Sequence, residues 1–574
     1  MQPAKQASNR SNWVSDIIIL GVIFAAFYFL KLGSYPFFTP DEGRYSEVAR
    51  EMLATGDFIT PRVNGIAFLD KPILYYWMQA ASMGTFGVHE WSVRFFPVFY
   101  GLFGCIAVYL AARRLFNRQT GILSAIILGL SPLYFGASHY ANLDLEVAVL
   151  ISISLLAFLT AAETKDQNNK ILFITAYLFA GLAFLTKGLI GAAFPAMIIG
   201  AWIALTRRWR LLASMHLGKG ILIFALITLP WFALVQRANP EFLHFFFVTQ
   251  QVSRFLSAAE FNNKAPIWFY LPVIMVGFIP WTGFVLQALA GQIRNCLLHL
   301  KTRAHTSELF LLFWIVIIFT FFSIPHSKTV SYILPVFPPL AILTGKYLAD
   351  AWETQIRPRG ITLGIILVMI INLLIAALVF ALPYFWVDLP VNFTPTLFAV
   401  GVELLCSALL LAFLMRKLRT PVLFTICTVT SAVMLLTFSL GAHNLTMNSA
   451  KPLVEKLRPM LKPTDTVANY FKFYQDIPLY LGRTMVLVYD WQSPDIEMRD
   501  NWVRELWYSM PFQKTDDILL NESAFWKRWN SSERVYVFVN SNYFNQFRSH
   551  THQYYLVGRH NDIILLSNQR PYSV

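Results

Sequence analysis

Long apolar runs recur along almost the whole chain, and they restrict its possible folds more than any other feature. Each is close to the length that an α-helix needs to cross a hydrocarbon core of about 30 Å. Hydrophobic residues make up 56% of the 574 positions and charged residues only 14%, which is too apolar for a soluble globular protein. The sequence predicts a polytopic α-helical membrane protein with about thirteen transmembrane helices. The predicted spans are residues 16–32, 92–112, 120–136, 143–162, 171–186, 188–206, 219–236, 267–287, 308–324, 329–349, 360–381, 396–415 and 420–441.

Lysine and arginine fall in alternate loops, which predicts the orientation of the spans. Short cytoplasmic loops collect these residues. Basic clusters precede the first span and recur near residues 113–118, 207–219, 294–303, 346–359 and 416–419. We therefore expect a cytoplasmic N-terminus, with the loop around Asp41 and everything after about residue 442 on the opposite face. The first apolar run has no small-residue cleavage site behind it, so we expect it to be retained.

The composition changes abruptly near residue 446, where acidic residues, Asn, Trp and Tyr become frequent. This change divides the chain into a transmembrane domain, residues 1–446, and an outer α/β domain, residues 447–574, which is long enough to bury its own core. Alternating and β-rich segments predict strands and short helices in the outer domain. The predicted strands are 478–489, 534–540 and a hairpin over 554–567, and the predicted helices are 500–508 and 523–529.

The acidic stretch after the first span is the strongest functional signal. It contains Pro40-Asp41-Glu42-Gly43-Arg44-Tyr45 directly beside a membrane-length run. Apolar residues then recur at helical spacing up to Leu53, which indicates an amphipathic helix in the membrane interface. We expect its remaining charges to form a solvated face, and these are Glu47, Arg50 and Glu51. A capping role is the structural alternative for Asp41.

Four further outer segments place charged groups at membrane boundaries. An enzyme that acts on a lipid phosphate needs cations for the phosphate, a carboxylate near the reacting carbon and an aromatic groove for the lipid tail. Helix capping by Asn142 or Asp144 and snorkelling by the basic residues are the structural alternatives. The candidates are Lys71 after Asp70, Asp144 beside Glu146, Arg254, and Lys328 with Tyr332.

Other classes of site have weak support. The histidines and the four cysteines show no metal-ligand spacing and no disulfide framework, so no metal site is predicted. The net charge of +14 suits contact with anionic lipid head groups, and no nucleic-acid motif accompanies it. A transporter or flippase is the alternative from another class, but it would place charges within spans and repeat its two halves.

Three motifs resemble the lipid-linked-sugar glycosyltransferases of the GT-C fold, which include the protein O-mannosyltransferases. They are Pro40-Asp41-Glu42-Gly43-Arg44-Tyr45, Leu69-Asp70-Lys71-Pro72, and His326-Ser327-Lys328 leading to Tyr332-Ile-Leu-Pro335. Within this superfamily the chain is most similar to the bacterial transferases that add 4-amino-4-deoxy-L-arabinose to lipid A. The order of acidic first loop, about thirteen spans and C-terminal outer domain resembles theirs as well.

The resemblance implies an inverting transfer of that sugar from undecaprenyl phosphate to lipid A at the periplasmic face of the bacterial inner membrane, which confers resistance to polymyxin. It implies no cofactor and leaves the metal requirement open. Asp41 and Asp144 would be the catalytic carboxylates. Lipid phosphate and sugar would be bound by Lys71, Arg254, Arg44, Tyr45, Lys328, Tyr332 and Glu42.

Two questions stay open at the level of sequence. Asp41 would act as a general base for a hydroxyl acceptor. A lipid A phosphate is already ionised, so Asp41 and Asp144 would then hold an ammonium group or stabilise positive charge on the sugar ring. A related enzyme that moves mannose, galacturonic acid or another sugar to protein or lipopolysaccharide core would share all these motifs.

Overall fold

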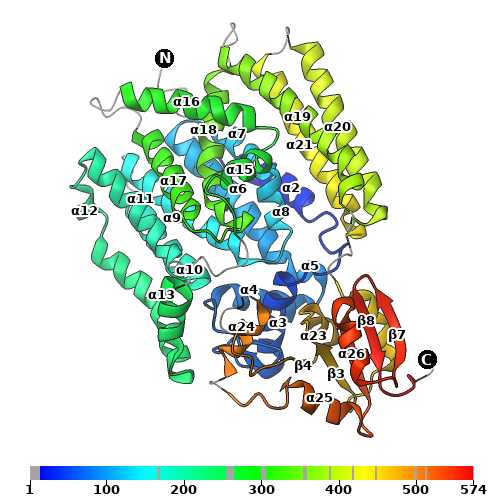
Figure 1. Cartoon of the computed structure of the whole chain (residues 1–574). Helices are drawn as coiled ribbons and strands as arrows, with labels where there is room; N and C mark the ends of the chain where they lie inside the picture. The colour runs from blue at the N-terminus through cyan, green and yellow to red at the C-terminus, as the bar shows by residue number, and fades with distance from the viewer. Residues whose placement is uncertain are drawn as a thin grey trace. The chain divides into compact units, whose positions relative to one another are not determined.

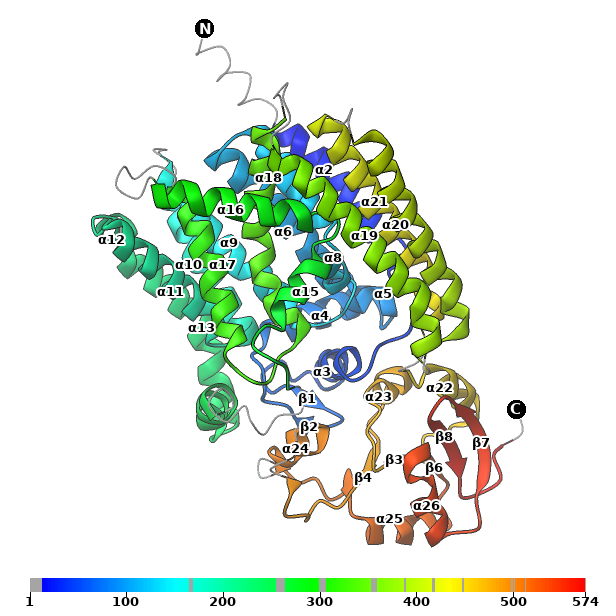
Figure 2. The same ribbon diagram turned by 45° about the horizontal axis from the view of Figure 1, so that its top comes forward.

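The structure, a computed structural model, is mostly helical, with one larger β-sheet built from the C-terminal part of the chain (Figures 1 and 2). It describes residues 13–164, 169–253, 264–298, 306–352, 359–386, 389–415, 419–445, 449–496, 499, 501–510 and 513–572. Internal packing divides the chain into two compact units. The helical unit comprises Met1–Ser34, Arg94–Pro230 and Asn263–Asn444, and the mixed unit comprises Tyr35–Val93, Trp231–Asn262 and Leu445–Val574.

Every predicted span coincides with a helix or with a pair of helices. Within the described residues, nine helices are long and apolar enough to cross a membrane, two bent pairs add up to two spans, and two apolar helices are shorter. The predicted polytopic fold is therefore confirmed. The elements are α2 (Trp13–Tyr28), α6 (Phe95–Leu115), α7 (Arg118–Gly129), α8 (Pro132–Ser138), α9 (Leu143–Glu163), α10 (Asn169–Lys187), α11 (Ile190–Thr206), α13 (Leu217–Ala238), α15 (Tyr270–Gly277), α16 (Thr282–Leu298), α17 (Thr306–Ser323), α18 (Phe337–Asp350), α19 (Arg359–Phe385), α20 (Thr394–Leu414) and α21 (Thr420–Gly441).

Two of the spans that the sequence predicts as single helices are broken. The axes of α7 and α8 meet at 65°, and those of α15 and α16 at 116°. A residue before proline is disfavoured in the α conformation. Ser131 precedes Pro132 and is extended, with φ −77° and ψ 125°. Pro280 lies between α15 and α16, and it has no N–H to continue a helix.

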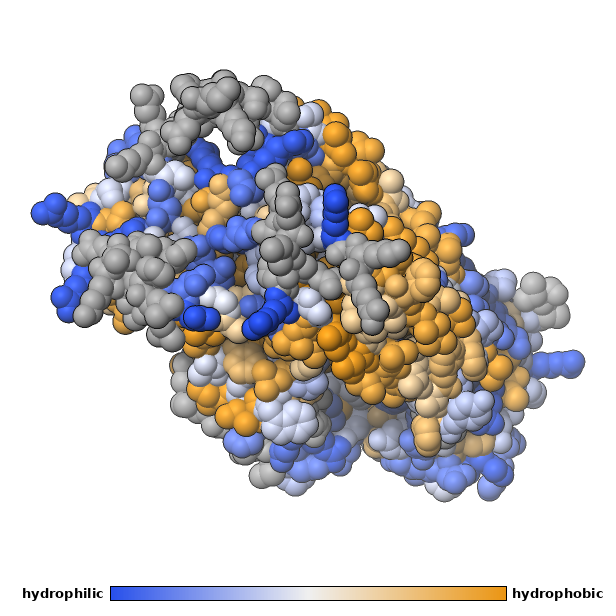
Figure 3. Space-filling view, turned by 90° about the horizontal axis from the view of Figure 1, so that it is seen from above, coloured by the Kyte–Doolittle hydropathy of each residue, from blue (hydrophilic) through white to orange (hydrophobic). Residues whose placement is uncertain are grey.

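Helix α9 lies at the centre of the helical unit and packs against α6 and α10. Its side chains are apolar nearly all round, which is typical of a helix buried on every side. The helices α19, α20 and α21 lie side by side and expose apolar residues such as Leu374, Leu378 and Phe413. Figure 3 shows a broad hydrophobic surface over these three helices. Such a surface suits contact with lipid chains.

The mixed unit contains a six-stranded sheet with the strand order β5-β4-β3-β6-β8-β7. The strands from β5 to β6 are parallel, and β8 and β7 continue the sheet antiparallel. Both faces are covered, because apolar side chains of β3 and β6 alternate between two hydrophobic cores. The strands are β3 (Thr466–Tyr470), β4 (Val486–Val488), β5 (Leu519–Leu520), β6 (Val535–Asn540), β7 (Tyr555–His560) and β8 (Ile563–Ser567).

The predicted α/β character of this region is confirmed, with one local error. The expected hairpin is β7–β8, whose two-residue turn contains Asn561 at φ 49°. Part of the predicted strand 478–489 is instead helix α23 (Asp476–Leu481). A proline is tolerated in the first helical turn, and Gly482 ends the helix in the left-handed region. The domain boundary near residue 446 stays a prediction.

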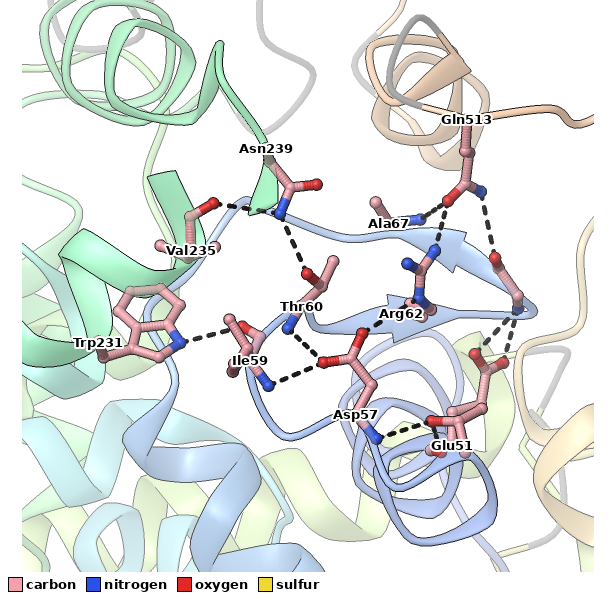
Figure 4. A network of polar contacts seen from close by, with 12 residues as sticks. Glu51, Asp57, Ile59, Thr60, Arg62, Ala67, Trp231, Val235, Asn239 and Gln513 are labelled. Atoms are coloured by element: carbon pink, nitrogen blue, oxygen red, sulfur yellow. Dashed lines mark hydrogen bonds and ion pairs between the residues drawn. The ribbon is translucent and has the colours of Figure 1, made fainter. Parts of the chain in front are cut away.

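The first loop also belongs to the mixed unit, where distant segments bind it (Figure 4). The Trp231 indole donates to the Ile59 carbonyl at 3.0 Å, and the Asn239 amide donates to the Thr60 hydroxyl at 3.0 Å. Gln513 accepts a hydrogen bond from Arg62. The elements of this loop are α3 (Asp41–Thr55), β1 (Arg62–Val63), β2 (Ile66–Ala67), α4 (Leu74–Phe86) and α5 (Glu90–Val93).

Gly43 of α3 packs closely against the backbone at the start of α23. A Cβ at this position would lie 2.6 Å from the Asp476 nitrogen and 2.7 Å from the Gln475 carbonyl carbon. We expect Gly43→Ala to lower the free energy of unfolding by about 1–3 kcal/mol, because backbone must move to admit the methyl group. Thermal unfolding in detergent measures this change. Gly200→Ala is the control, since a Cβ there meets nothing within 4 Å. Equal melting temperatures for the two variants would contradict the close packing.

Asp476 makes the stability of the mixed unit depend on pH. Burial raises its pKa to about 6, against hydrogen bonds from the Ala450 N–H and the Ser449 hydroxyl that lower it. The folded state thus binds the proton more tightly than the unfolded state between about pH 4 and pH 6. The contribution of Asp476 to the free energy of unfolding therefore falls as the pH rises through this window and is constant above it.

The variant Asp476→Asn removes this dependence while preserving an oxygen acceptor. We expect the variant to gain stability relative to the natural protein as the pH rises from about 4 to about 6, by at most about 3 kcal/mol. Melting temperatures of both proteins over this range give the difference. A difference that does not change with pH would refute the titration of Asp476.

Candidate functional site

The predicted site residues of the first loop gather at the start of α3. Pro40 occupies the N-cap position, and Asp41 is the first residue of the helix. The Asp41 carboxylate accepts a hydrogen bond from Arg44 Nη2 at 2.7 Å, one helical turn later. Glu42 is fully buried, and its carboxylate accepts the Phe38 N–H at 2.9 Å. Glu42 thus holds the chain that enters the helix, whereas Asp41 joins an ion pair.

Arg44 lies between two carboxylates and beside two aromatic rings. Its Nη1 is 2.6 Å from both carboxylate oxygens of Glu505, and its guanidinium carbon lies 4.9 Å from the centre of the Tyr45 ring and 5.6 Å from that of Phe68. We call Asp41, Arg44 and Glu505 the first-loop triad. Two acids and one base give the triad a formal charge of −1.

Lys71 lies in the turn between β2 and α4 and is half-buried, next to the buried Asp70. The helix α4 that follows carries Tyr75 and Tyr76, whose rings pack 6.0 and 6.2 Å from the ring of Tyr45. The Tyr76 hydroxyl is buried and has no hydrogen-bond partner among the described residues. Lys71 and Tyr45 therefore belong to the same first-loop segment as Asp41 and Arg44, while their roles stay predictions.

Asp144 belongs to a second group, at the ends of helices of the helical unit. It is the second residue of α9, where the Asn142 side chain caps the helix by accepting the Asp144 N–H at 2.9 Å. Capping is thus done by Asn142, and the Asp144 carboxylate is available for ion pairing. It binds the ammonium of Lys187, the last residue of α10, and accepts a hydrogen bond from the Ser331 hydroxyl.

Tyr332 completes this second group, which we call the span-end cluster: Asp144, Lys187, Ser331 and Tyr332. Ser331 and Tyr332 lie in the 3₁₀ helix η3 (Val330–Val336), and Lys187 Nζ is 4.2 Å from the centre of the Tyr332 ring. Asp144 is buried, and the Lys187 side chain is only 13% exposed. A cation is thus held between a carboxylate and an aromatic face where helices α9, α10 and η3 meet.

Lys328 contacts backbone carbonyls in the structure. It is buried, and its ammonium donates to the carbonyl of Ala265 at 3.0 Å and to that of Pro325. Burial lowers the pKa of this amine. These contacts join the segment before α15 to the segment after α17, so phosphate binding by Lys328 stays a prediction. Arg254 lies outside the described residues.

The prediction that the remaining charges of α3 form a solvated face is wrong. Glu47, Arg50 and Glu51 are all buried, because α4, β1 and α23 pack around the helix. Glu47 pairs with Arg50 at 2.5 Å, and Glu51 accepts the Gly65 N–H at 2.8 Å. Burial raises the pKa of Glu47 to about 8, although the hydrogen bond from Arg50 opposes this. These residues anchor α3.

Three polar residues of the two groups were not among the predicted site residues. Lys187 stands between two apolar runs, and a lone base at a break between spans is a usable signal. Ser331 and Glu505 carry no such signal, since their importance comes only from contact with Asp144 and Arg44. Within the described part of the chain, no group of three or more His, Cys, Asp or Glu side chains is arranged to hold a metal ion.

Comparison with known sequences places the chain among sugar transferases. Residues 70–234 match the family described as dolichyl-phosphate-mannose-protein mannosyltransferase. An undecaprenyl phosphate-alpha-4-amino-4-deoxy-L-arabinose arabinosyl transferase of Yersinia enterocolitica is 32% identical over 66% of this chain and 68% of its own length. A second such transferase, from Proteus mirabilis, is 34% identical over 60% of this chain, and the match spans 61% of the relative's length.

Comparison with solved structures covers nearly the whole chain. The crystal structure of ArnT from Cupriavidus metallidurans bound to undecaprenyl phosphate has a TM-score of 0.83 and 25% identity, over 98% of this chain and 99% of that one. The apo structure of the same protein has a TM-score of 0.81 and 24% identity, over 97% and 98% of the two chains. The predicted GT-C fold is therefore confirmed.

The ion pair between Asp144 and Lys187 predicts that removing one partner destabilises the protein more than removing both charges. Lys187→Met leaves the buried Asp144 carboxylate without this cation, which we expect to lower the free energy of unfolding by about 3–5 kcal/mol. Adding Asp144→Asn removes the stranded charge and restores most of the loss. Thermal unfolding in detergent measures both effects.

The control for this prediction is Lys472→Met, which breaks an exposed pair with Asp562 and changes stability by at most about 1 kcal/mol. Additive losses in the Lys187→Met, Asp144→Asn double variant would show that the two side chains are not a buried pair.

Proposed function

Since this multi-pass membrane protein belongs to the family of undecaprenyl phosphate-alpha-4-amino-4-deoxy-L-arabinose arabinosyl transferases, we propose that it transfers 4-amino-4-deoxy-L-arabinose. The donor would be undecaprenyl phosphate carrying this sugar, and the acceptor a phosphate group of lipid A. Adding a cationic sugar to lipid A would lower its negative charge and so weaken the binding of polymyxin and other cationic peptides.

One observation carries the proposal: the chain is similar over nearly its full length to a structure that was solved with undecaprenyl phosphate bound. A polyprenyl phosphate needs a membrane-embedded protein with cations where its head group lies. The chain supplies apolar helices for the lipid tail, and it holds Lys187 at a helix end and Lys71 beside aromatic residues.

The reaction would be a substitution at the anomeric carbon of the sugar. The bond from this carbon to the undecaprenyl phosphate oxygen breaks, a bond to the acceptor phosphate oxygen forms on the opposite face, and the configuration inverts. Negative charge develops on the departing phosphate, so cations there stabilise the transition state. We propose this role for Lys71 of the first loop. Arg254, Lys187, Lys328 and Tyr332 are separate candidates for donor binding.

The carboxylates would act on the sugar. An acceptor phosphate is ionised near neutral pH and needs no general base, so Asp41 and Asp144 would instead stabilise positive charge on the sugar ring or hold its ammonium group. Each carboxylate is already paired with a cation, Asp41 with Arg44 and Asp144 with Lys187, and we propose Asp41 as the one that meets the sugar. Arg44, Tyr45 and Glu42 would support Asp41 on α3.

We further propose that the reaction takes place on the periplasmic side of the bacterial inner membrane. The basic loops predict a cytoplasmic N-terminus, which would place the first loop and the C-terminal residues on the opposite side. The mixed unit supports this assignment, because it groups the first loop with the C-terminal segment.

A related transferase with another sugar or acceptor is the second candidate. The match of residues 70–234 to a mannosyltransferase family favours it. Such an enzyme would use the same kind of donor but a hydroxyl acceptor, and Asp41 would then serve as its general base.

Mass spectrometry of lipid A tests the proposal directly. Cells that lack the protein should lose an aminopentose from a lipid A phosphate, and the wild-type gene should restore it. The Asp41→Asn gene should restore at least about 100-fold less of the modified lipid A than the wild-type gene does, because stabilisation of charge in the transition state is lost.

Asp490→Asn, which changes an exposed carboxylate of the same unit, is the matched control and should restore the modification. Lipid A that is unchanged by loss of the protein would exclude this acceptor and favour the second candidate. Full restoration by Asp41→Asn would reject the assigned role of Asp41.

A further inference from the structure

Glu505 reaches the first loop from the far end of the chain. It lies on α24 (Trp502–Trp507), 461 positions after Arg44, and both its carboxylate oxygens are 2.6 Å from Arg44 Nη1. The same guanidinium uses Nη2 to bind Asp41 at 2.7 Å. Asp41 and Glu505 therefore hold the two ends of one planar group.

The position of Glu505 is itself well fixed. The Asn501 side chain caps α24 by accepting the Val503 N–H at 3.0 Å, and Val503 and Leu506 are buried on either side of Glu505. The side chains of Arg44 and Glu505 are only 13% and 23% exposed. A part-buried contact of this kind orients its partners much better than an exposed ion pair does.

Placing two acids beside Arg44 in a part-buried site costs desolvation energy. The two carboxylates also have a geometric effect on the guanidinium. With one carboxylate at each end, the guanidinium plane is fixed, whereas with Asp41 alone the guanidinium could turn and bind both oxygens of that carboxylate.

We propose that Glu505 is a positioning residue: by holding Arg44 from the side opposite Asp41, it fixes the direction in which the Asp41 carboxylate meets the sugar. This inference rests on the proposed transfer reaction. It makes the C-terminal segment part of the reaction centre, although Glu505 itself touches neither sugar nor phosphate. It also assigns Arg44 to the orientation of Asp41, in place of binding the donor phosphate.

Steady-state kinetics of the full-length protein in detergent tests the role of Glu505. The donor is the polyprenyl-phosphate sugar that the wild type turns over, and the acceptor is lipid A. Glu505→Gln keeps the size of the side chain and removes its charge. We expect kcat to fall about 10- to 100-fold, since misplacing a reacting group by 1 Å can cost about 100-fold, with the KM for the donor unchanged within about twofold.

Three further variants sharpen the result. Glu505→Asp keeps the charge on a shorter stem and should recover part of the lost kcat. Arg44→Lys replaces the fork with a point charge, and Glu505→Gln should cause little further loss in that background. Glu455→Gln is the control, because Glu455 is exposed and lies 3.9 Å from Lys451 in the same unit. Its kcat should equal that of the wild type.

The outcomes separate this inference from the proposed function. Wild-type protein that transfers another sugar refutes the proposed donor, and the ratio of variant to wild-type kcat still tests Glu505. A Glu505→Gln variant with kcat within twofold of the wild type, or with only a raised KM, overturns the inference. If the Glu505→Gln variant melts below the assay temperature, the Glu505→Asp variant is used for the test instead. An unchanged kcat in the folded Glu505→Asp variant overturns the positioning role of Glu505.

Discussion

Burial of the charged helix α3 is the constraint on which the mixed unit depends. The helix carries both signs of charge, yet ten of its fifteen residues are buried. A buried charge must be paired or hydrogen-bonded, because leaving it unpaired costs several kcal/mol. Its partners come from segments far along the chain, such as Glu505 for Arg44 and the Gly482 carbonyl for Arg50. The C-terminal segment thus completes the environment that α3 needs.

The helical unit solves the same problem at a membrane boundary. Asp144 is buried and Lys187 is part-buried where helix ends meet, and Ser331 gives the carboxylate a second partner. A cation held by only one acid and one ring keeps much of its attraction for an anion, whereas one held by two carboxylates does not. Lys187, with one carboxylate partner, therefore attracts a phosphate more strongly than Arg44, which has two. For this reason we propose a phosphate-binding role for Lys187 and an orienting role for Arg44.

The sequence predicts the features that depend on local composition. Spans follow from length and hydrophobicity, and the β7–β8 hairpin follows from two β-rich runs around Asn561 and Asp562. Helix α3 follows from periodic spacing, but its environment does not. Glu47 and Glu51 look solvated in sequence because nothing local shows that α4, β1 and α23 cover them. Glu505 has no local signal at all, since its role is defined by Arg44, 461 positions away.

That separation also affects how the first-loop triad can form. Arg44 and Asp41 emerge early in synthesis, whereas their partner at residue 505 follows only after the remaining spans have been made. Contacts between distant residues must also offset the entropy of closing a long loop. The membrane reduces this cost, because inserted spans already limit where the chain ends can lie. The first-loop triad is therefore complete only after the C-terminal segment, which carries Glu505, has been made and has folded onto α3.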